Sequence, residues 1–402
     1  MSDLALTLDA TVALQQAARL YRAPRVASPS EAERAHLAAA RRLDVGPMPA
    51  AGRGASSLGE LVDGVAFRAM RRFFSRVHRG ELDGAGYDEL EGGWLAVAGS
   101  ASLERERYFP APAATSVRVV RERAGCLPDG GSIEDLELPS DYSDRPAARQ
   151  LLERYPENAV AHARCYRHPG AGRPALIWLH GWGMGFHGVE AFVCRARRLY
   201  ALGLDVYLYV LPYHARRRPR GVRFAGEVFP TTHMTRSNEG VIQAAWECRS
   251  LMAWHRQRAS APCGVAGLSL GGYLAAVLAS VAPETAFCAC LMPVADLPTL
   301  MWSNGEGTDE RRRAEEAGIT FDMFCRSMAV HAPLAHQLLL PPERVLLVGA
   351  RADRIIPPVH TEVLHEHWGR PRLCWIPGGH IVHLGRRAYL AELEELVRAT
   401  VL

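Results

Sequence analysis

The sequence contains no lysine, so all 47 residues of its combined Lys and Arg count are arginine. A Walker-type phosphate loop needs a lysine against the phosphates, and a pyridoxal enzyme needs one to form its Schiff base. A Ser-Lys dyad is excluded as well, because arginine does not give up its proton in proteins. The absence of lysine therefore removes three classes of enzyme.

Long apolar runs and closely spaced cysteines are also missing. No run reaches the roughly 18 apolar residues that a membrane-spanning helix needs. Asp3 and Asp9 stand where a secretory signal carries positive charge. The 9 cysteines form no Cys-x-x-Cys pair, which argues against a zinc ribbon or a disulfide framework. We therefore expect a cytoplasmic protein with no transmembrane segment, no bound metal and no cofactor.

The remaining composition is that of an ordinary globular protein. A net charge of only +4 gives no ground for a nucleic-acid partner without a clustered basic face. A chain of 402 residues with 48% hydrophobic and 22% charged residues suits one large domain and an accessory region. Nothing in the composition bears on the oligomeric state.

Residues 1–150 differ in pattern from the rest of the chain. Residues 115–123 are compatible with a strand, and residues 132–146 are predicted to form an irregular connection. Most other signals before residue 150 are helical. We therefore predict a mainly helical N-terminal extension over 1–150 and a second domain over 151–402.

Helical patterns in this extension cover residues 4–22, roughly 30–43 and 67–80. The last of them is a basic amphipathic pattern, with arginines between its apolar positions. Such a helix either makes peripheral contact with a membrane or packs on the protein with its arginines in water. We favour packing, because amphipathic helices are the commonest surface element. The apolar positions are Phe67, Met70, Phe73, Phe74 and Val77.

From about residue 159 onward, short apolar strands alternate with helical segments. Continuous apolar strands separated by helices are typical of a mostly parallel sheet that is covered by helices on both faces. The predicted fold class is therefore α/β. The predicted strands are residues 159–167, 174–181, 204–212, 264–269, 286–294, 344–350 and 372–378.

Ser269 lies between a predicted strand and a predicted helix, in the sequence GLSLG at 267–271. A serine at such a sharp turn has a strained backbone, and its neighbours must be small for the turn to close. The N-terminus of the following helix favours negative charge, which suits an oxyanion. The pattern predicts a nucleophilic serine. Small residues that let this helix approach the sheet follow at Gly272, Ala275, Ala276 and Ala279.

A serine hydroxyl becomes a good nucleophile when a neighbouring imidazole takes its proton and an acid orients that imidazole. In the chain order Ser, Asp, His, the acid and the base follow the nucleophile. Asp353 comes just after the apolar strand 345–348, and His380 comes just after the strand 373–376. Ser269, Asp353 and His380 therefore all fall at the carboxyl ends of parallel strands, where open α/β sheets place their sites.

With these motifs, the chain from about residue 159 to 402 resembles a serine hydrolase of the α/β-hydrolase superfamily. The motifs are HGWG at 180–183, GLSLGG at 267–272, GARAD at 349–353 and PGGH at 377–380. The resemblance implies an α/β-hydrolase fold, and it makes the domain over 151–402 the catalytic one. Residues 1–150 are not covered by it.

The resemblance also implies a role for each site residue. Ser269 is the expected nucleophile, Asp353 the acid that orients the imidazole, and His380 the general base. The backbone N–H groups of Leu270 and Trp182 are the expected oxyanion hole.

Three residues around Trp182 are further candidates. His180, Gly181 and Gly183 are the expected substrate contacts, and the N–H of Gly183 is the alternative to that of Trp182. We also expect His180 to brace its loop by hydrogen bonding rather than to transfer protons.

Rivals exist for two of the assignments. His383 is the alternative base, and Asp296, after an earlier strand, is the alternative acid unless it caps a helix. His360, His365 and His367 lack metal-ligand spacing, because positions two apart on a helix point in different directions. We prefer His380 and Asp353.

An insertion over about 297–341 is expected to form a lid, by similarity to the superfamily. Its large apolar residues have two interpretations that stay open: they line an acyl pocket, or they only pack the insertion onto the body. These residues are Met301, Trp302, Phe321, Met323 and Phe324.

The segment 211–224 leaves the carboxyl end of a predicted strand and is rich in arginine. Its arginines either attract an anionic substrate or form a solvated loop paired with acidic residues. We favour the second interpretation. The arginines are Arg216, Arg217, Arg218, Arg220 and Arg223.

The leading hypothesis is hydrolysis of a small-molecule or lipid-like carboxylic ester through an acyl-serine intermediate. The alternatives are an acyltransferase or thioesterase with the same triad, and a non-catalytic binding protein on a hydrolase scaffold.

Overall fold

The structure is a computed structural model that describes residues 13–17, 57, 59–68, 105–112, 116–231, 233–316 and 319–402. Residues 13–17 and 59–68 are helical. The helix expected over 30–43 and most of the basic segment 67–80 lie outside the described residues. None of the described helices combines the length and the apolar character needed to cross a membrane.

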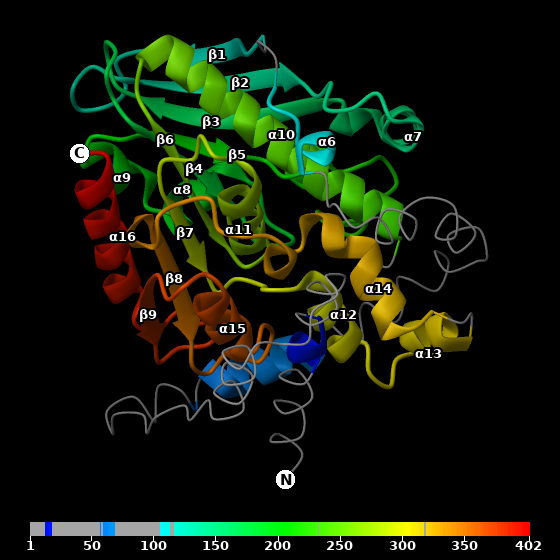
Figure 1. The fold of residues 1–402 in the computed structure, drawn as a ribbon. Helices are drawn as coiled ribbons and strands as arrows, with labels where there is room; N and C mark the ends of the chain where they lie inside the picture. Colours follow the sequence, from blue (N-terminus) through cyan, green and yellow to red (C-terminus); the bar gives the residue numbers. More distant parts are fainter. Residues whose placement is uncertain are drawn as a thin grey trace.

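Within the described residues, nine strands form one sheet in the order β1-β2-β3-β5-β4-β6-β7-β8-β9 (Figure 1). The pairs from β1 to β5 are antiparallel, and every pair from β5 to β9 is parallel. The predicted mostly parallel sheet is confirmed. The strands are β1 (Arg118–Arg123), β2 (Ser132–Pro139), β3 (Val160–Arg167), β4 (Ala175–Leu179), β5 (Asp205–Tyr209), β6 (Cys263–Leu268), β7 (Cys288–Leu291), β8 (Val345–Ala350) and β9 (Arg372–Ile376).

Helices cover both faces of this sheet, and a separate apolar cluster lies under each set of helices. Together with residues of the strands, one cluster includes side chains of α10, α11 and α15, and the other includes side chains of α9 and α16. The labelled helices are α6 (Arg105–Tyr108), α7 (Pro146–Arg154), α8 (His187–Val193), α9 (Ala196–Ala201), α10 (Met234–Ala259), α11 (Leu270–Val281), α12 (Leu297–Asn304), α13 (Asp309–Glu316), α14 (Phe321–Met328), α15 (Val359–His367) and α16 (Arg386–Thr400).

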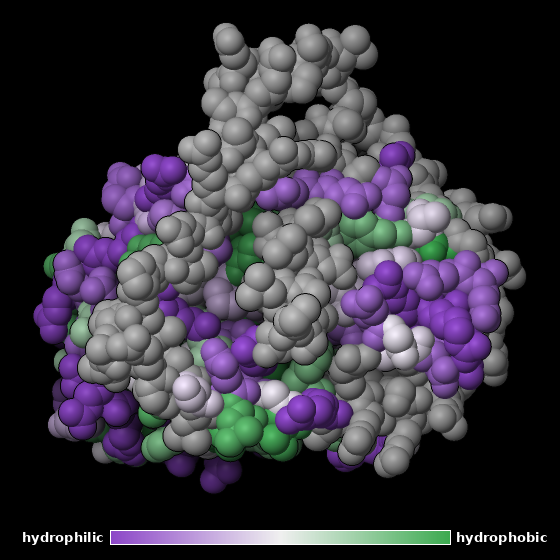
Figure 2. Space-filling view, turned by 90° about the horizontal axis from the view of Figure 1, so that it is seen from below, coloured by the Kyte–Doolittle hydropathy of each residue, from purple (hydrophilic) through white to green (hydrophobic). Residues whose placement is uncertain are grey.

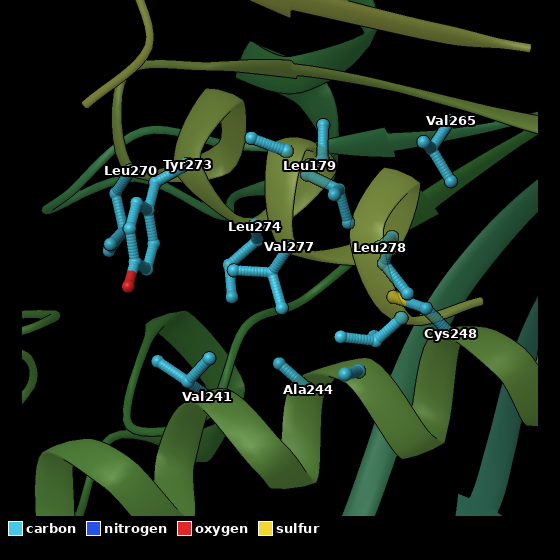
Figure 3. Close-up of a cluster of buried hydrophobic side chains, with 14 of the residues drawn as sticks. Leu179, Val241, Ala244, Cys248, Val265, Leu270, Tyr273, Leu274, Val277 and Leu278 are labelled. Atoms are coloured by element: carbon cyan, nitrogen blue, oxygen red, sulfur yellow. The ribbon is translucent and has the colours of Figure 1, made fainter. Parts of the chain in front are cut away.

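The helix α11 is buried along its whole length. A helix that is apolar all round must be enclosed on every side, and α11 lies between the sheet and α10. Figure 3 shows Val277 and Leu278 on the side of α11 that faces Ala244 and Cys248 of α10. Because α11 begins directly after Ser269, this packing fixes the start of the helix relative to the sheet.

The irregular connection predicted over 132–146 is wrong for its first half, which is strand β2. The prediction failed because Glu134 and Asp135 are buried within this strand. Arg258 pairs with Glu134 at 2.6 Å, and Arg164 pairs with Asp135 at 2.7 Å. These arginines come from other elements, so the strand pattern alone does not reveal that its carboxylates are neutralised.

The sheet therefore begins before the boundary placed at residue 150. Strands β1 and β2 pair with the central sheet through β3, so residues 118–139 belong to the same body as the parallel strands. The strand expected within 115–123 is β1, and the mainly helical character predicted for 1–150 does not extend to residues 118–139.

The insertion over 297–341 lies between β7 and β8 and contains the short helices α12, α13 and α14. Asp296 and Thr320 begin α12 and α14, and each side chain accepts a backbone N–H of the first turn. Helix α12 packs against α14.

Candidate active site

The turn that carries Ser269 has the geometry expected of it. Ser269 directly follows β6 with φ 58° and ψ −115°, a strained conformation for a residue with a side chain. Its N–H donates to the carbonyl of Leu291 at 2.9 Å. A Cβ on Gly271 would lie 2.0 Å from the Leu179 oxygen, and one on Gly267 would lie 2.1 Å from the Gly271 oxygen. Positions 267 and 271, two residues before and two residues after Ser269, must therefore both be glycine.

The structure brings Ser269, His380 and Asp353 into one chain of contacts at the carboxyl edge of the sheet. Nε2 of His380 lies 2.9 Å from Oγ of Ser269, and Nδ1 lies 2.7 Å from Oδ2 of Asp353. The other carboxylate oxygen of Asp353 accepts the N–H groups of Ile355 at 2.9 Å and Ile356 at 2.7 Å. Both oxygens of the Asp353 carboxylate thus have hydrogen-bond partners, which fixes the orientation of the carboxylate toward the imidazole.

The negative charges of nearby carboxylates favour a role for His380 as a general base. Burial lowers the pKa of His380, but the charge and hydrogen bond of Asp353 and the charge of Asp63 outweigh burial, so its pKa is raised above the ordinary value. Asp63 belongs to the helix over 59–68. Such an imidazole has an increased affinity for the proton that a serine hydroxyl must lose.

The alternative base, His383, and the alternative acid, Asp296, make other contacts. Nε2 of His383 donates to the carbonyl of His380 at 2.8 Å, and Nδ1 contacts the Tyr389 hydroxyl at 3.1 Å. Because a carbonyl only accepts, Nε2 of His383 carries the proton. The Asp296 carboxylate accepts from the N–H of Thr299 at 3.0 Å, so it is the cap of α12. Neither residue occupies the position of the base or the acid.

Of the two predicted oxyanion donors, Leu270 directly follows Ser269 and Trp182 lines the same cavity. Leu270 is the first residue of α11, and the N–H of a first-turn residue has no acceptor within its own helix. A Cβ on Gly181 would lie 3.6 Å from the Cβ of Ser269, so the HGWG loop passes beside the nucleophile. The Trp182 indole donates to the carbonyl of Gly226 at 2.8 Å, which anchors this loop.

Glu190 holds the segment that directly follows the HGWG motif, through a contact that sequence reasoning missed. One oxygen of its buried carboxylate accepts the N–H of Gly185 at 3.0 Å, and the other accepts the Trp178 indole N–H at 3.0 Å. The sequence offers no motif for this contact, since it depends on how α8 packs beside β4.

His180, one of the expected substrate contacts, is not among the residues that line the cavity beside Ser269. It is fully buried, with Nδ1 donating to the carbonyl of Gly181 at 2.7 Å and Nε2 accepting the N–H of Leu211 at 3.0 Å. Both ring nitrogens are therefore used inside the protein, as the expected bracing role requires. Gly181 lines the cavity beside Ser269, whereas Gly183 does not.

A cavity of about 950 Å³ opens beside Ser269 and His380. Its wall is mostly apolar. Met301, Trp302 and Phe324 of the insertion line it, whereas Phe321 and Met323 do not. The acyl-pocket interpretation thus fits three of the five residues, and Phe321 packs against Trp302 at 5.9 Å between ring centroids.

The arginines of 211–224 do not line this cavity. Arg217 is buried and pairs with Glu247 at 2.6 Å. Arg223 pairs with Glu227 at 2.9 Å, and Arg220 lies 3.7 Å from Glu157. The interpretation that these arginines pair with acidic residues therefore describes the segment better than attraction of an anionic substrate.

Sequence reasoning also missed the helix over 59–68. Ala66 and Phe67 line the cavity, and Asp63 accepts hydrogen bonds from the loop that carries His380. No motif marks this helix, and 317 positions separate Asp63 from His380. Among the described residues, no group of three or more His, Cys, Asp or Glu side chains is arranged to hold a metal ion.

The face toward which β8 and β9 point in Figure 1 is the one seen in Figure 2. Hydrophobic patches lie there between larger hydrophilic areas (Figure 2). The helix over 59–68 lies at this end of the molecule (Figure 1), and its apolar residues Leu61 and Val65 are exposed.

Comparison with known proteins agrees with this fold. A family model described as alpha/beta hydrolase domain containing 18 matches residues 196–308, a stretch that includes Ser269. Acetyl xylan esterase 1 from Thermoanaerobacterium aligns with a TM-score of 0.50 at 15% identity, over 78% of this chain and 94% of that one. The protein has the α/β-hydrolase fold. Its resemblance to the α/β-hydrolase superfamily is thereby confirmed.

Two curated proteins, from two strains of Mycobacterium tuberculosis, are each 38% identical to this chain over 247 residues. Both are uncharacterized. The match covers 60% of this chain and 57% of theirs, so the chain spans somewhat more than half of the length of these relatives.

Proposed function

We propose that this protein is a serine hydrolase that cleaves a carboxylic ester through an acyl-serine intermediate. The observation that carries the proposal is the continuous contact chain from Oγ of Ser269 through both nitrogens of His380 to Asp353, at 2.9 and 2.7 Å. Nucleophile, base and orienting acid within hydrogen-bonding reach are what acyl transfer requires.

In the proposed reaction, Nε2 of His380 takes the Oγ proton as Ser269 attacks the ester carbonyl carbon. The carbonyl oxygen becomes an oxyanion that accepts the N–H groups of Leu270 and Trp182. When the tetrahedral intermediate collapses, the bond to the alkoxide breaks and His380 gives its proton to the leaving alcohol. Asp353 stays ionised and stabilises the imidazolium.

Water then completes the cycle. It attacks the acyl carbon while His380 takes one of its protons, and the second tetrahedral intermediate releases the carboxylic acid. The proton on His380 returns to Oγ of Ser269, which restores the free enzyme.

The cavity supports an apolar acyl group. Its wall carries Met301, Trp302 and Phe324, and its volume of about 950 Å³ is near the upper end of ordinary ligand pockets. A larger acyl chain excludes more apolar surface from water, at about 0.8 kcal/mol for each buried methylene. Esters of longer acids are therefore the proposed substrates in preference to acetates.

Acyl transfer is the second candidate, because the same cavity also has room for an acceptor alcohol, amine or thiol beside the acyl group. The two reactions share the acyl-serine and differ in what attacks it. Product analysis with and without an added alcohol separates them: the free acid alone indicates a hydrolase, and a new ester indicates a transferase.

The test is a panel of aryl esters from acetyl to long-chain acyl, assayed on the unmodified protein and on Ser269→Ala. We expect turnover that improves with acyl length and is lost in Ser269→Ala by on the order of 10⁶-fold. The variant should keep the fold, because it removes only one oxygen. Turnover that survives in Ser269→Ala would contradict the proposal.

A further inference from the structure

Asp63 is a fully buried carboxylate on the helix over 59–68, outside residues 196–308, which the family model matches. Its Oδ2 accepts the backbone N–H of His380 at 2.5 Å, and its Oδ1 accepts the N–H of Ile381 at 3.0 Å. Two consecutive N–H groups therefore point at one carboxylate. Charge-assisted hydrogen bonds of this kind are about twice as strong as neutral ones.

The same carboxylate reaches the loop that carries the acid. Oδ2 of Asp63 lies 3.3 Å from the N–H of Arg354, the residue after Asp353. Glu60, one helical turn earlier, pairs with the Arg354 guanidinium at 3.1 Å. The helix thus joins the loops after β8 and β9, the two loops that supply the base and its partner (Figure 1).

The fit between the helix and the His380 loop is close. A Cβ on Gly379 would lie 2.5 Å from Oδ2 of Asp63, and a Cβ on Gly59 would lie 2.7 Å from the N of Gly379. Both positions admit only glycine without displacement. The glycine before His380 therefore serves this contact, as well as the turn itself.

We propose that Asp63 is a positioning residue for the base: it fixes the backbone at His380 and holds the loops of His380 and Asp353 together. The inference rests on the proposed function, and it makes the helix over 59–68 part of the catalytic centre. The role follows from what Asp63 binds, since it contacts the backbone of the base and not the reacting atoms.

Asp63 also adds negative charge beside the imidazole. Among the described residues, the titratable groups that face His380 are Asp63 from the helix, Asp353 from the loop after β8 and His383 from its own loop. The charges of Asp353 and Asp63 both raise the pKa of His380. Removing Asp63 should lower that pKa, while the larger effect of Asp353 remains.

The test compares Asp63→Ala and Asp63→Asn with a matched control, Asp205→Asn. Asp205 is likewise buried and accepts a backbone N–H, that of His168 at 2.8 Å, but at the opposite end of β5 from the site. Asp63→Ala should lower kcat on the order of 10²-fold with little change in KM. The kcat of Asp63→Asn should lie between those of Asp63→Ala and the unmodified protein, because the amide keeps one acceptor oxygen. Asp205→Asn should lose stability and keep kcat.

Two further readouts separate positioning from a purely structural role. The acidic limb of kcat/KM should move to lower pH in Asp63→Asn and stay in place in Asp205→Asn. Hydrogen exchange of residues 379–382 needs no substrate and should become faster in Asp63→Ala only. An unmodified protein that equals Ser269→Ala in turnover would overturn the proposed function. An active protein whose kcat, pH limb and exchange are unchanged in Asp63→Ala would overturn the positioning role.

Discussion

His180 is buried and His380 is partly buried, both in loops that leave the carboxyl edge of the sheet, yet their partners differ. His380 lies between Ser269 and the Asp353 carboxylate. His180 has only backbone partners, the carbonyl of Gly181 and the N–H of Leu211. Its other neighbour is a second imidazole, that of His214, at 5.0 Å between ring centroids.

The difference in partners sets the two pKa values apart. Burial lowers the pKa of His180 well below the ordinary value, and the nearby His214 lowers it further. At His380 burial acts in the same direction, but carboxylates reverse the result. A buried imidazole without a carboxylate therefore stays neutral and braces a loop, whereas one with a carboxylate is able to hold a proton.

Removal of the imidazole at 380 should have the largest effect. His380→Ala should lower kcat on the order of 10⁶-fold, because Ser269 then has no base. His383→Ala, the control in the same loop, should stay within about tenfold of the unmodified protein, because its ring contacts the His380 carbonyl and the Tyr389 hydroxyl and not Ser269. Steady-state kinetics on both variants checks this. Equal losses in the two variants would mean that the base is not His380.

Removal of the Asp353 charge beside the His380 imidazole should have the next largest effect on kcat. Asp353→Asn should lower kcat on the order of 10⁴-fold, because an amide neither stabilises the imidazolium nor enforces the required tautomer. The base works as a neutral ring, so activity rises with pH through its pKa. Since Asp353 raises that pKa, the acidic limb of kcat/KM should move to lower pH in the variant. An acidic limb that stays in place in Asp353→Asn would mean that Asp353 does not raise the pKa of His380. The contrast between His380 and His180 would then be wrong.

A smaller effect on catalysis should come from His180. His180→Ala leaves the Gly181 carbonyl and the Leu211 N–H without their partner, at a cost of about 1–3 kcal/mol for each buried group. The free energy of unfolding should fall, kcat should fall by about tenfold through the disturbed HGWG loop, and the acidic limb should not move. Urea denaturation and a pH profile measure both. A shifted limb would show that His180 titrates in the reaction.

Much of this site could be predicted from the sequence because its residues carry local signals. Ser269 follows an apolar strand and precedes a run of small residues, and Asp353 and His380 each follow an apolar strand by a few positions. These patterns depend on local geometry: a turn that admits only glycine, and strands whose carboxyl ends meet at one edge.

Contacts between distant segments could not be predicted in this way. Asp63 belongs to no motif, and its partners are backbone N–H groups, which every residue but proline offers. Strand β2 was missed because its buried Glu134 and Asp135 are neutralised by Arg258 and Arg164, far along the chain. In both cases the stabilising partner becomes visible only when the fold brings it near.

The central claim is that Ser269 is a nucleophile because His380 takes its proton. The most direct measurement is labelling with a fluorophosphonate, followed by peptide mass spectrometry. The account predicts one adduct on Ser269, absent in Ser269→Ala and formed far more slowly in His380→Ala. A folded protein that forms no adduct, or one whose adduct lies on another residue, would contradict it.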